Sequence, residues 1–134
     1  VGEALRPLHR IASGGELSRL LLALKAVLAS VDRVATAIFD EVDTGVGGAV
    51  AEVVGRELSG IAQERQVIVI THLPQIAAQA DHHLVVEKRT SGERTTTGVR
   101  ALNDDQRMEE VARMLGGVEI TRRTREHAAE LLGH

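Results

Sequence analysis

Residues 34–41 read Val-Ala-Thr-Ala-Ile-Phe-Asp-Glu, a largely apolar run of strand length that ends in two acidic side chains. A strand without regular polar alternation is typical of a parallel sheet that is buried on both faces. Residues 66–71 read Gln-Val-Ile-Val-Ile-Thr, form a second run of this kind and are followed directly by His72. Residues 49–62, between the two runs, have the spacing of a helix. These segments predict two parallel strands joined by a helix, and therefore an α/β fold.

The flanking segments extend this unit in both directions. Ser13 and Glu16 match the capping box of a helix that continues to about residue 29, with leucines at helical spacing. A parallel pair alone leaves sheet edges that need further strands, so the chain is expected to be part of a larger sheet. The other predicted elements are a short helix beginning at Pro74, an antiparallel hairpin over 83–102, a helix over about 104–115 capped by Asn103 or Asp104, and a helix over about 121–132.

Composition narrows the class of protein. A length of 134 residues suits one domain. No apolar run approaches the roughly 20 residues of a membrane helix, and the N-terminus lacks the basic region of a signal peptide. The absence of cysteine fits the cytoplasm. Sixteen basic against 19 acidic residues, with a single aromatic residue, argue against a broad nucleic-acid-binding face on this segment.

Glycines open the first predicted helix. Ser13, Gly14, Gly15 and Glu16 stand at its N-terminus, where free N–H groups and the helix dipole favour a phosphate. Glycine lets the backbone approach such a group closely. An ordinary capped helix start is the alternative, and this segment alone does not decide between the two.

A phosphate-binding loop of the G-x-x-x-x-G-K-[ST] kind is absent from this sequence. Its lysine must follow a glycine, whereas Lys25 follows leucine and Lys88 follows glutamate. The sequence therefore predicts one part of a nucleoside triphosphate site, with the phosphate cradle elsewhere.

Asp40 and Glu41 follow the first predicted strand, at the carboxyl end of the sheet where α/β proteins bind ligands. Mg²⁺ takes few protein ligands, so Asp40 is the predicted magnesium ligand. Glu41 beside it is predicted to orient or deprotonate an attacking water. Such a pair can instead cap the next helix, but residues 42–45 intervene before any predicted helix, which favours the functional interpretation.

His72 ends the second predicted strand. It is expected either to donate a hydrogen bond to a terminal phosphate or to bond the backbone in a turn. With Asp40 and Glu41 at the same sheet edge, the phosphate role is favoured. No metal site is expected at His82 and His83, because adjacent strand residues point to opposite faces.

These segments resemble the ABC-type ATPases. Residues 12–16, Ala-Ser-Gly-Gly-Glu, look like the signature motif, and residues 38–41, Ile-Phe-Asp-Glu, look like the Walker B segment with its catalytic glutamate. Residues 44–47 fall at the D-loop and His72 at the switch histidine. The superfamily usually closes the D-loop with Asp, where this chain has Gly47, so that residue's role is not carried over.

Within that superfamily the chain is similar to the RecN family of SMC-like bacterial DNA repair ATPases. The resemblance runs nearly the whole length. It is carried by residues 11–19, 39–48, 71–77, 81–83 and 113–117. It implies that residues 1–134 are the C-terminal lobe of a head domain whose Walker A loop lies in the N-terminal lobe of the same protein.

In heads of this family two protomers sandwich ATP, so the resemblance implies a homodimer with ATP and Mg²⁺ as cofactors. Ser13–Glu16 would contact ATP held by the partner head, and Thr44 and Gly45 would bind nucleotide from the D-loop. Asp40, Glu41 and His72 would act on nucleotide in their own head.

The implied function is ATP-dependent head dimerisation in DNA double-strand break repair and recombination, in the bacterial cytoplasm at the nucleoid. DNA is an implied partner, mainly through other parts of the protein, and no membrane is involved. One alternative is a transporter nucleotide-binding subunit, which Glu16 and residues 42–43 disfavour, since transporters usually have Gln and Pro-Thr there. Another is a non-catalytic dimerisation module, which would need neither Glu41 nor His72.

Overall fold

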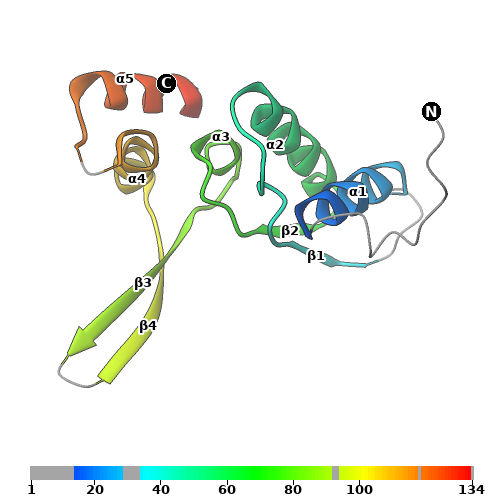
Figure 1. The fold of residues 1–134 in the computed structure, drawn as a ribbon, viewed down its shortest axis with the longest axis horizontal. Coiled ribbons are helices and arrows are strands. Elements are labelled where there is room, and N and C mark those ends of the chain that lie inside the picture. The colour runs from blue at the N-terminus through cyan, green and yellow to red at the C-terminus, as the bar shows by residue number, and fades with distance from the viewer. Residues whose placement is uncertain (1–13, 29–33, 92–93, 118, 134) are drawn as a thin grey trace, which may run out of the picture. The chain divides into compact units, whose positions relative to one another are not determined.

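The computed structural model describes residues 14–28, 34–91, 94–117 and 119–133 (Figure 1). The chain forms two compact units, Val1–Ile76 and Ala77–His134. None of the described helices is long and apolar enough to cross a membrane.

The first unit is built on a parallel strand pair. Strands β1 (Thr36–Phe39) and β2 (Gln66–Val69) pair in parallel over their full lengths. Helix α2 (Ala49–Ala62) connects them and, together with α1 (Gly14–Val27), lies along one face of the strands (Figure 1). The short helix α3 (Pro74–Ala77) follows β2. The predicted α/β unit and its element order are confirmed.

The core of the first unit lies between this strand face and the helices. Helix α2 turns a buried stripe toward it because its apolar residues recur every three or four positions. Phe39, at the end of β1, is 3% exposed and anchors the strand in this core. The buried core residues are Leu22, Phe39, Val42, Ala51, Val54, Leu58, Ile61 and Ile76.

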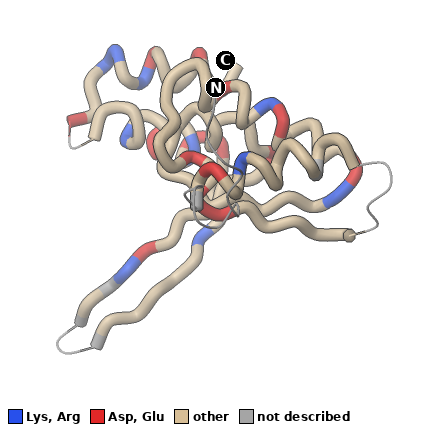
Figure 2. Tube along the Cα trace, turned by 45° about the vertical axis from the view of Figure 1, so that its right-hand side comes forward, with Lys and Arg blue, Asp and Glu red and all other residues tan. Residues whose placement is uncertain are grey.

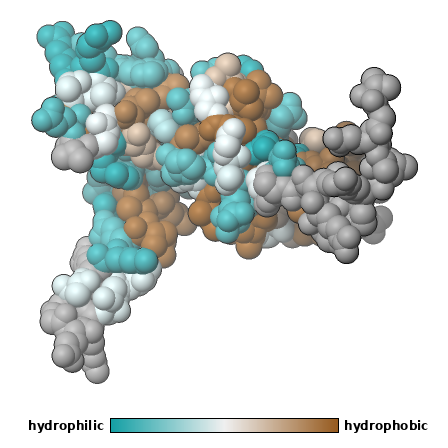
Figure 3. All heavy atoms as spheres, viewed as in Figure 1, coloured by the Kyte–Doolittle hydropathy of each residue, from teal (hydrophilic) through white to brown (hydrophobic). Residues whose placement is uncertain are grey.

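The opposite face of the strand pair is open among the described residues. Ile38 is 65% exposed, Ile70 57% and Ile68 41%. Figure 3 shows hydrophobic residues on the strand side of this unit. The prediction that both strands are buried on both faces is therefore wrong for this chain. Among the described residues, nothing buries the apolar side chains on this face.

The second unit joins a hairpin to a helix pair. Strands β3 (Leu84–Ser91) and β4 (Arg94–Ala101) are antiparallel, and the hairpin extends away from α4 (Asp104–Gly116) and α5 (Arg122–Leu132) (Figure 1). The predicted hairpin and both C-terminal helices are confirmed. A small core holds the helices together and is made of Val111, Ala112 and Ala128.

Side chains cap both helices of this unit. The Asn103 side chain accepts a hydrogen bond from Gln106 N at 2.9 Å, and Gln106 Oε1 accepts one from Asn103 N at 3.2 Å. This capping box shows that Asn103, of the two predicted candidates, caps α4. Thr121 caps α5 through the backbone N–H of Thr124. Each cap of this kind stabilises its helix by about 1 kcal/mol.

Arg107 fastens α4 to the residues that follow α3. Its Nη2 donates to the carbonyl oxygens of Ala78, at 2.9 Å, and of Ala80. These carbonyls lie at a helix C-terminus, where a cation is favourable.

His83, just before β3, gives this unit a pH dependence. Its side chain is partly buried, and Nδ1 is buried without a hydrogen-bond partner among the described residues. Burial lowers the pKa of His83, the Glu110 carboxylate raises it and the Arg107 guanidinium lowers it, and the net result is below the ordinary value of 6.5. The unfolded chain therefore takes up this proton first as the pH falls.

We expect the contribution of His83 to stability to be complete above about pH 7. Below pH 6.5 it should decline, by at most about 1.4 kcal/mol per pH unit for one proton. Thermal unfolding of the chain between pH 8 and pH 5 measures this. His83→Gln should flatten the profile, whereas His82→Gln at the exposed neighbouring position should leave it unchanged. Identical profiles for wild type and His83→Gln would contradict the assignment.

Candidate active site

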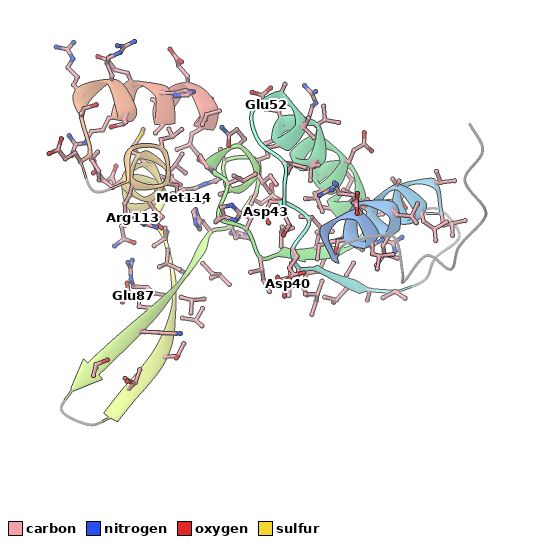
Figure 4. The ribbon with its side chains drawn as sticks, in the orientation of Figure 1. Asp40, Asp43, Glu52, Glu87, Arg113 and Met114 are labelled. Carbon is pink, nitrogen blue, oxygen red and sulfur yellow. The ribbon has the colours of Figure 1, made fainter. Side chains whose placement is uncertain are left out.

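The loops after β1 and β2 emerge at one edge of the sheet. Ile70 N donates to Phe39 O at 3.0 Å, which continues the strand pairing one step beyond β2. Asp40 and Thr71 therefore leave the sheet at the same edge, as ligand-binding residues of parallel sheets do. Asp40 and Glu41 are exposed there, and Figure 4 marks Asp40 at the end of β1.

Glu41 has an unusual backbone. Its φ of 59° makes it the one non-glycine residue with positive φ in the described part of the chain. Left-handed backbone costs about 1–2 kcal/mol for a residue with a Cβ, and such strain gathers at functional sites. Two turns hold it, since Thr44 N donates to Glu41 O and Val46 N to Asp43 O, both at 3.2 Å. The sequence gives no local sign of this conformation.

Asp43 joins the two loops. It is 4% exposed, and its Oδ2 accepts hydrogen bonds from Thr71 Oγ1 at 2.6 Å and from His72 N at 2.9 Å. The same oxygen lies 3.0 Å from His72 Nδ1. Burial alone raises the pKa of Asp43, but the hydrogen bonds from Thr71 and His72 and the imidazole charge outweigh it, so the pKa is lowered. Asp43 is a buried carboxylate at the junction of the loops (Figure 4).

Sequence reasoning assigned no role to Asp43. A usable signal was present: an acidic residue four positions after the end of one strand, with hydroxyl and imidazole side chains shortly after the neighbouring parallel strand. The structure brings His72 to Asp43 while leaving the His72 side chain 76% exposed. His72 is therefore fixed on one side and open to solvent on the other.

Helix α1 is fastened to the loop that follows β1. Ser18 Oγ donates to Asp40 O at 3.0 Å. Arg19 Nη1 donates to Thr44 O at 2.7 Å and to Val42 O at 3.4 Å. Hydrogen bonds thus join the segment predicted as the signature helix to the segment predicted as the D-loop.

Gly15 is buried where these segments meet. A Cβ at this position would lie 2.8 Å from Thr44 Cβ and 3.0 Å from Thr44 O. Gly14 begins α1 and Glu16 is exposed in its first turn. Ser13 lies outside the described residues, so the predicted capping box and the role of Ser13 stay predictions.

The remaining predicted ligands lie in the open. Thr44 and Gly45 are exposed, and Gly45 has a φ of 72°, which favours glycine. Within the described ranges, no group of three or more His, Asp or Glu side chains could hold a metal ion. Asp40 offers one exposed carboxylate, which fits Mg²⁺ bound mainly through water and phosphate oxygens.

No protein-family profile matches the chain. It is 52% identical to DNA repair protein RecN of Halalkalibacterium halodurans, 52% to that of Deinococcus radiodurans and 48% to that of Bacillus subtilis. Each match covers 131 residues, or 98% of this chain. By sequence, the chain belongs to the RecN family. It spans 23% of the length of each of these RecN relatives.

A solved structure is similar to this RecN-family segment in fold. It comes from work titled "Structural biochemistry of ATP-driven dimerization and DNA stimulated activation of SMC ATPases", with a TM-score of 0.57. The match covers 88% of this chain and 70% of that one, at 20% identity. The RecN-family segment therefore shares the fold of an SMC ATPase, which confirms the predicted fold class.

Proposed function

We propose that this segment is the C-terminal lobe of the ATP-hydrolysing head of a RecN-type DNA repair protein. The observation that carries the proposal is the match to proteins named DNA repair protein RecN along 98% of the chain. The sheet edge supports it, because Asp40, Glu41 and His72 stand on adjacent strand ends whose loops are joined by Asp43. The SMC ATPase fold is consistent with this role.

In the proposed reaction each residue has its own task. Asp40 supplies a carboxylate ligand to Mg²⁺, which when bound neutralises charge on the phosphate oxygens. Glu41 accepts a proton from the attacking water, with its backbone direction set by the turns that follow β1. His72 donates a hydrogen bond to the terminal phosphate. General bases of this kind contribute about 10²–10⁴ in rate.

The signature residues serve a second head. Ser13, Gly14, Gly15 and Glu16 contact ATP held by the partner protomer, and Thr44 and Gly45 approach it from the D-loop. The bonds from Arg19 to Thr44 O and Val42 O support this arrangement, because they join α1 to the residues of the predicted D-loop. ATP thereby drives closure of a homodimer of heads.

The N-terminal lobe of the same protein, which carries the Walker A loop, covers the open sheet face in this proposal. Ile38, Ile68 and Ile70 are exposed on that face. Burying a side chain of this type stabilises a protein by about 1.5–3 kcal/mol, so three of them give a strong reason for a covering lobe. The chain's small share of its relatives' length leaves room for such a lobe.

DNA is handled mainly by other parts of the protein. Figure 2 shows acidic and basic residues interspersed along the coloured chain rather than gathered in one basic stripe, and the net charge is −3. The role is in double-strand break repair and recombination, in the bacterial cytoplasm at the nucleoid.

The 134-residue chain alone should neither bind ATP tightly nor hydrolyse it, whereas the full-length protein should do both. The reason is the phosphate loop and its lysine, which normally provide the main grip on the β and γ phosphates and are absent here. Steady-state turnover by the purified segment and by the full-length protein tests this, with Glu41→Ala as the control in each. Turnover by the segment that Glu41→Ala abolishes would contradict the proposal.

A further inference from the structure

We propose that Asp43 is a positioning residue for ATP hydrolysis, which holds His72 by Nδ1 and directs its other ring nitrogen to the nucleotide. The inference rests on the proposed function and adds a residue to it. Neither the motif resemblance nor the sequence pattern gave Asp43 a role.

Asp43 and His72 differ strongly in burial, which indicates that Asp43 holds the pair in place and His72 reaches the nucleotide. The Asp43 residue is 4% exposed, while the His72 side chain is 76% exposed. Val42, beside Asp43, is fully buried in the core and fixes this part of the loop. Asp43 is therefore the buried partner of the pair, and His72 is the group that reaches solvent.

Thr71 sets the direction of the carboxylate. Leu73 N donates to Thr71 Oγ1 at 3.0 Å, so this oxygen acts as an acceptor toward the backbone. The Thr71 hydroxyl therefore donates its own hydrogen bond to Asp43 Oδ2, at 2.6 Å. His72 N donates to the same oxygen at 2.9 Å. The carboxylate is therefore held by two hydrogen bonds that do not involve the imidazole ring. Hydrogen bonds from these donors to a buried carboxylate are charge-assisted, and therefore shorter and stronger than bonds between neutral groups.

The pairing also fixes the proton on the imidazole. A carboxylate only accepts, so the 3.0 Å contact to Asp43 requires a proton on His72 Nδ1. Phosphate oxygens at the terminal phosphate also accept, so a bond to them from Nε2 requires a second proton on the ring. Asp43 thereby sets the orientation of the ring through Nδ1 and leaves Nε2 as the nitrogen for the phosphate.

The test uses the full-length RecN-type protein with Asp43→Asn, His72→Ala and the double variant. Asp43→Asn keeps the size of the side chain but removes its charge. We expect kcat for ATP hydrolysis to fall about 10- to 100-fold, as for other partners that orient a catalytic group, with KM for ATP nearly unchanged. In the His72→Ala background the same change should have no further effect. Glu57→Gln, an acid-to-amide change on the exposed side of α2, is the matched control and should leave kcat unchanged.

A purely structural role predicts a different pattern. The inference is overturned if the fold-decreases in kcat of Asp43→Asn and His72→Ala multiply in the double variant. It is also overturned if Asp43→Asn keeps the wild-type kcat. Thermal melting monitors folding. If Asp43→Asn is unfolded, Thr71→Val is used in its place in the same set of single and double variants, because it removes one hydrogen bond to the carboxylate. If the wild-type protein shows no ATP turnover, or turnover that Glu41→Ala leaves unchanged, the proposed function is overturned and the inference with it. If the wild type hydrolyses ATP and the two decreases in kcat multiply, only the inference is overturned and the proposed function stands.

Discussion

Glu41→Gln in the full-length RecN-type protein should lower the rate of ATP hydrolysis by about 10²–10⁴ while ATP still binds. Glutamine keeps the shape of the side chain and can hydrogen-bond the attacking water, but it cannot accept its proton. The turns after β1 hold the backbone of this position through Glu41 O, which the substitution retains. With cleavage blocked, the ATP-closed dimer of heads should accumulate.

Asp40→Asn is the comparison that separates the two acidic neighbours. It removes a charge from the proposed magnesium ligand and should weaken Mg²⁺-dependent ATP binding itself. ATP affinity and single-turnover hydrolysis are measured for both variants, with dimer formation followed by light scattering. If Glu41→Gln loses ATP binding as severely as Asp40→Asn, or keeps wild-type turnover, this division of roles is wrong.

Gly15→Ala should destabilise the first unit and impair ATP-dependent dimerisation. The new Cβ would lie 2.8 Å from Thr44 Cβ and 3.0 Å from Thr44 O, and the latter is backbone that cannot rotate away. Insertion of a methyl group into such a contact typically costs about 1–3 kcal/mol. Because Thr44 belongs to the predicted D-loop, the displacement should also reach the partner-facing surface.

Gly47→Ala is the matched control for this change. A Cβ at position 47 would meet nothing within 4 Å, and its φ lies outside the left-handed region, unlike that of Gly45. Thermal unfolding and ATP-dependent light scattering are compared for wild type and both variants. A similar loss of stability in Gly47→Ala and Gly15→Ala would show that helix or loop propensity, not the contact with Thr44, is responsible.

The sequence predicted the fold well because its strongest signals are local. Apolar runs of strand length, the spacing of α2 and the cap before α4 each depend on a few consecutive residues. The placement of Asp40 and His72 at one edge followed from parallel pairing, since the carboxyl ends of such strands meet.

The role of Asp43 could not be obtained in the same way. Its burial depends on how two loops, separated by α2 in the chain, approach each other, and no local pattern records that approach. The left-handed backbone of Glu41 escaped prediction for a related reason, because glutamate is not a residue that signals positive φ. Both features arise from tertiary contacts.

The error about the strands is of another kind. The apolar pattern at Ile38, Ile68 and Ile70 reports that these side chains need a cover, and it contains no information about which part of a protein supplies it. In this chain the cover is absent from the described residues. In the structure Ile38, Ile68 and Ile70 are exposed, so the prediction of burial on both faces is wrong for the described residues.

At position 41, thermal stability and the proposed catalytic role favour different residues. Glycine adopts a φ of 59° without steric strain, so a glycine there would release about 1–2 kcal/mol of strain, partly offset by the greater freedom of its unfolded chain. A laboratory search for heat-resistant variants that ignores turnover would therefore favour glycine at this position and discard the carboxylate. Engineering of this protein should hold position 41 fixed and seek stability elsewhere.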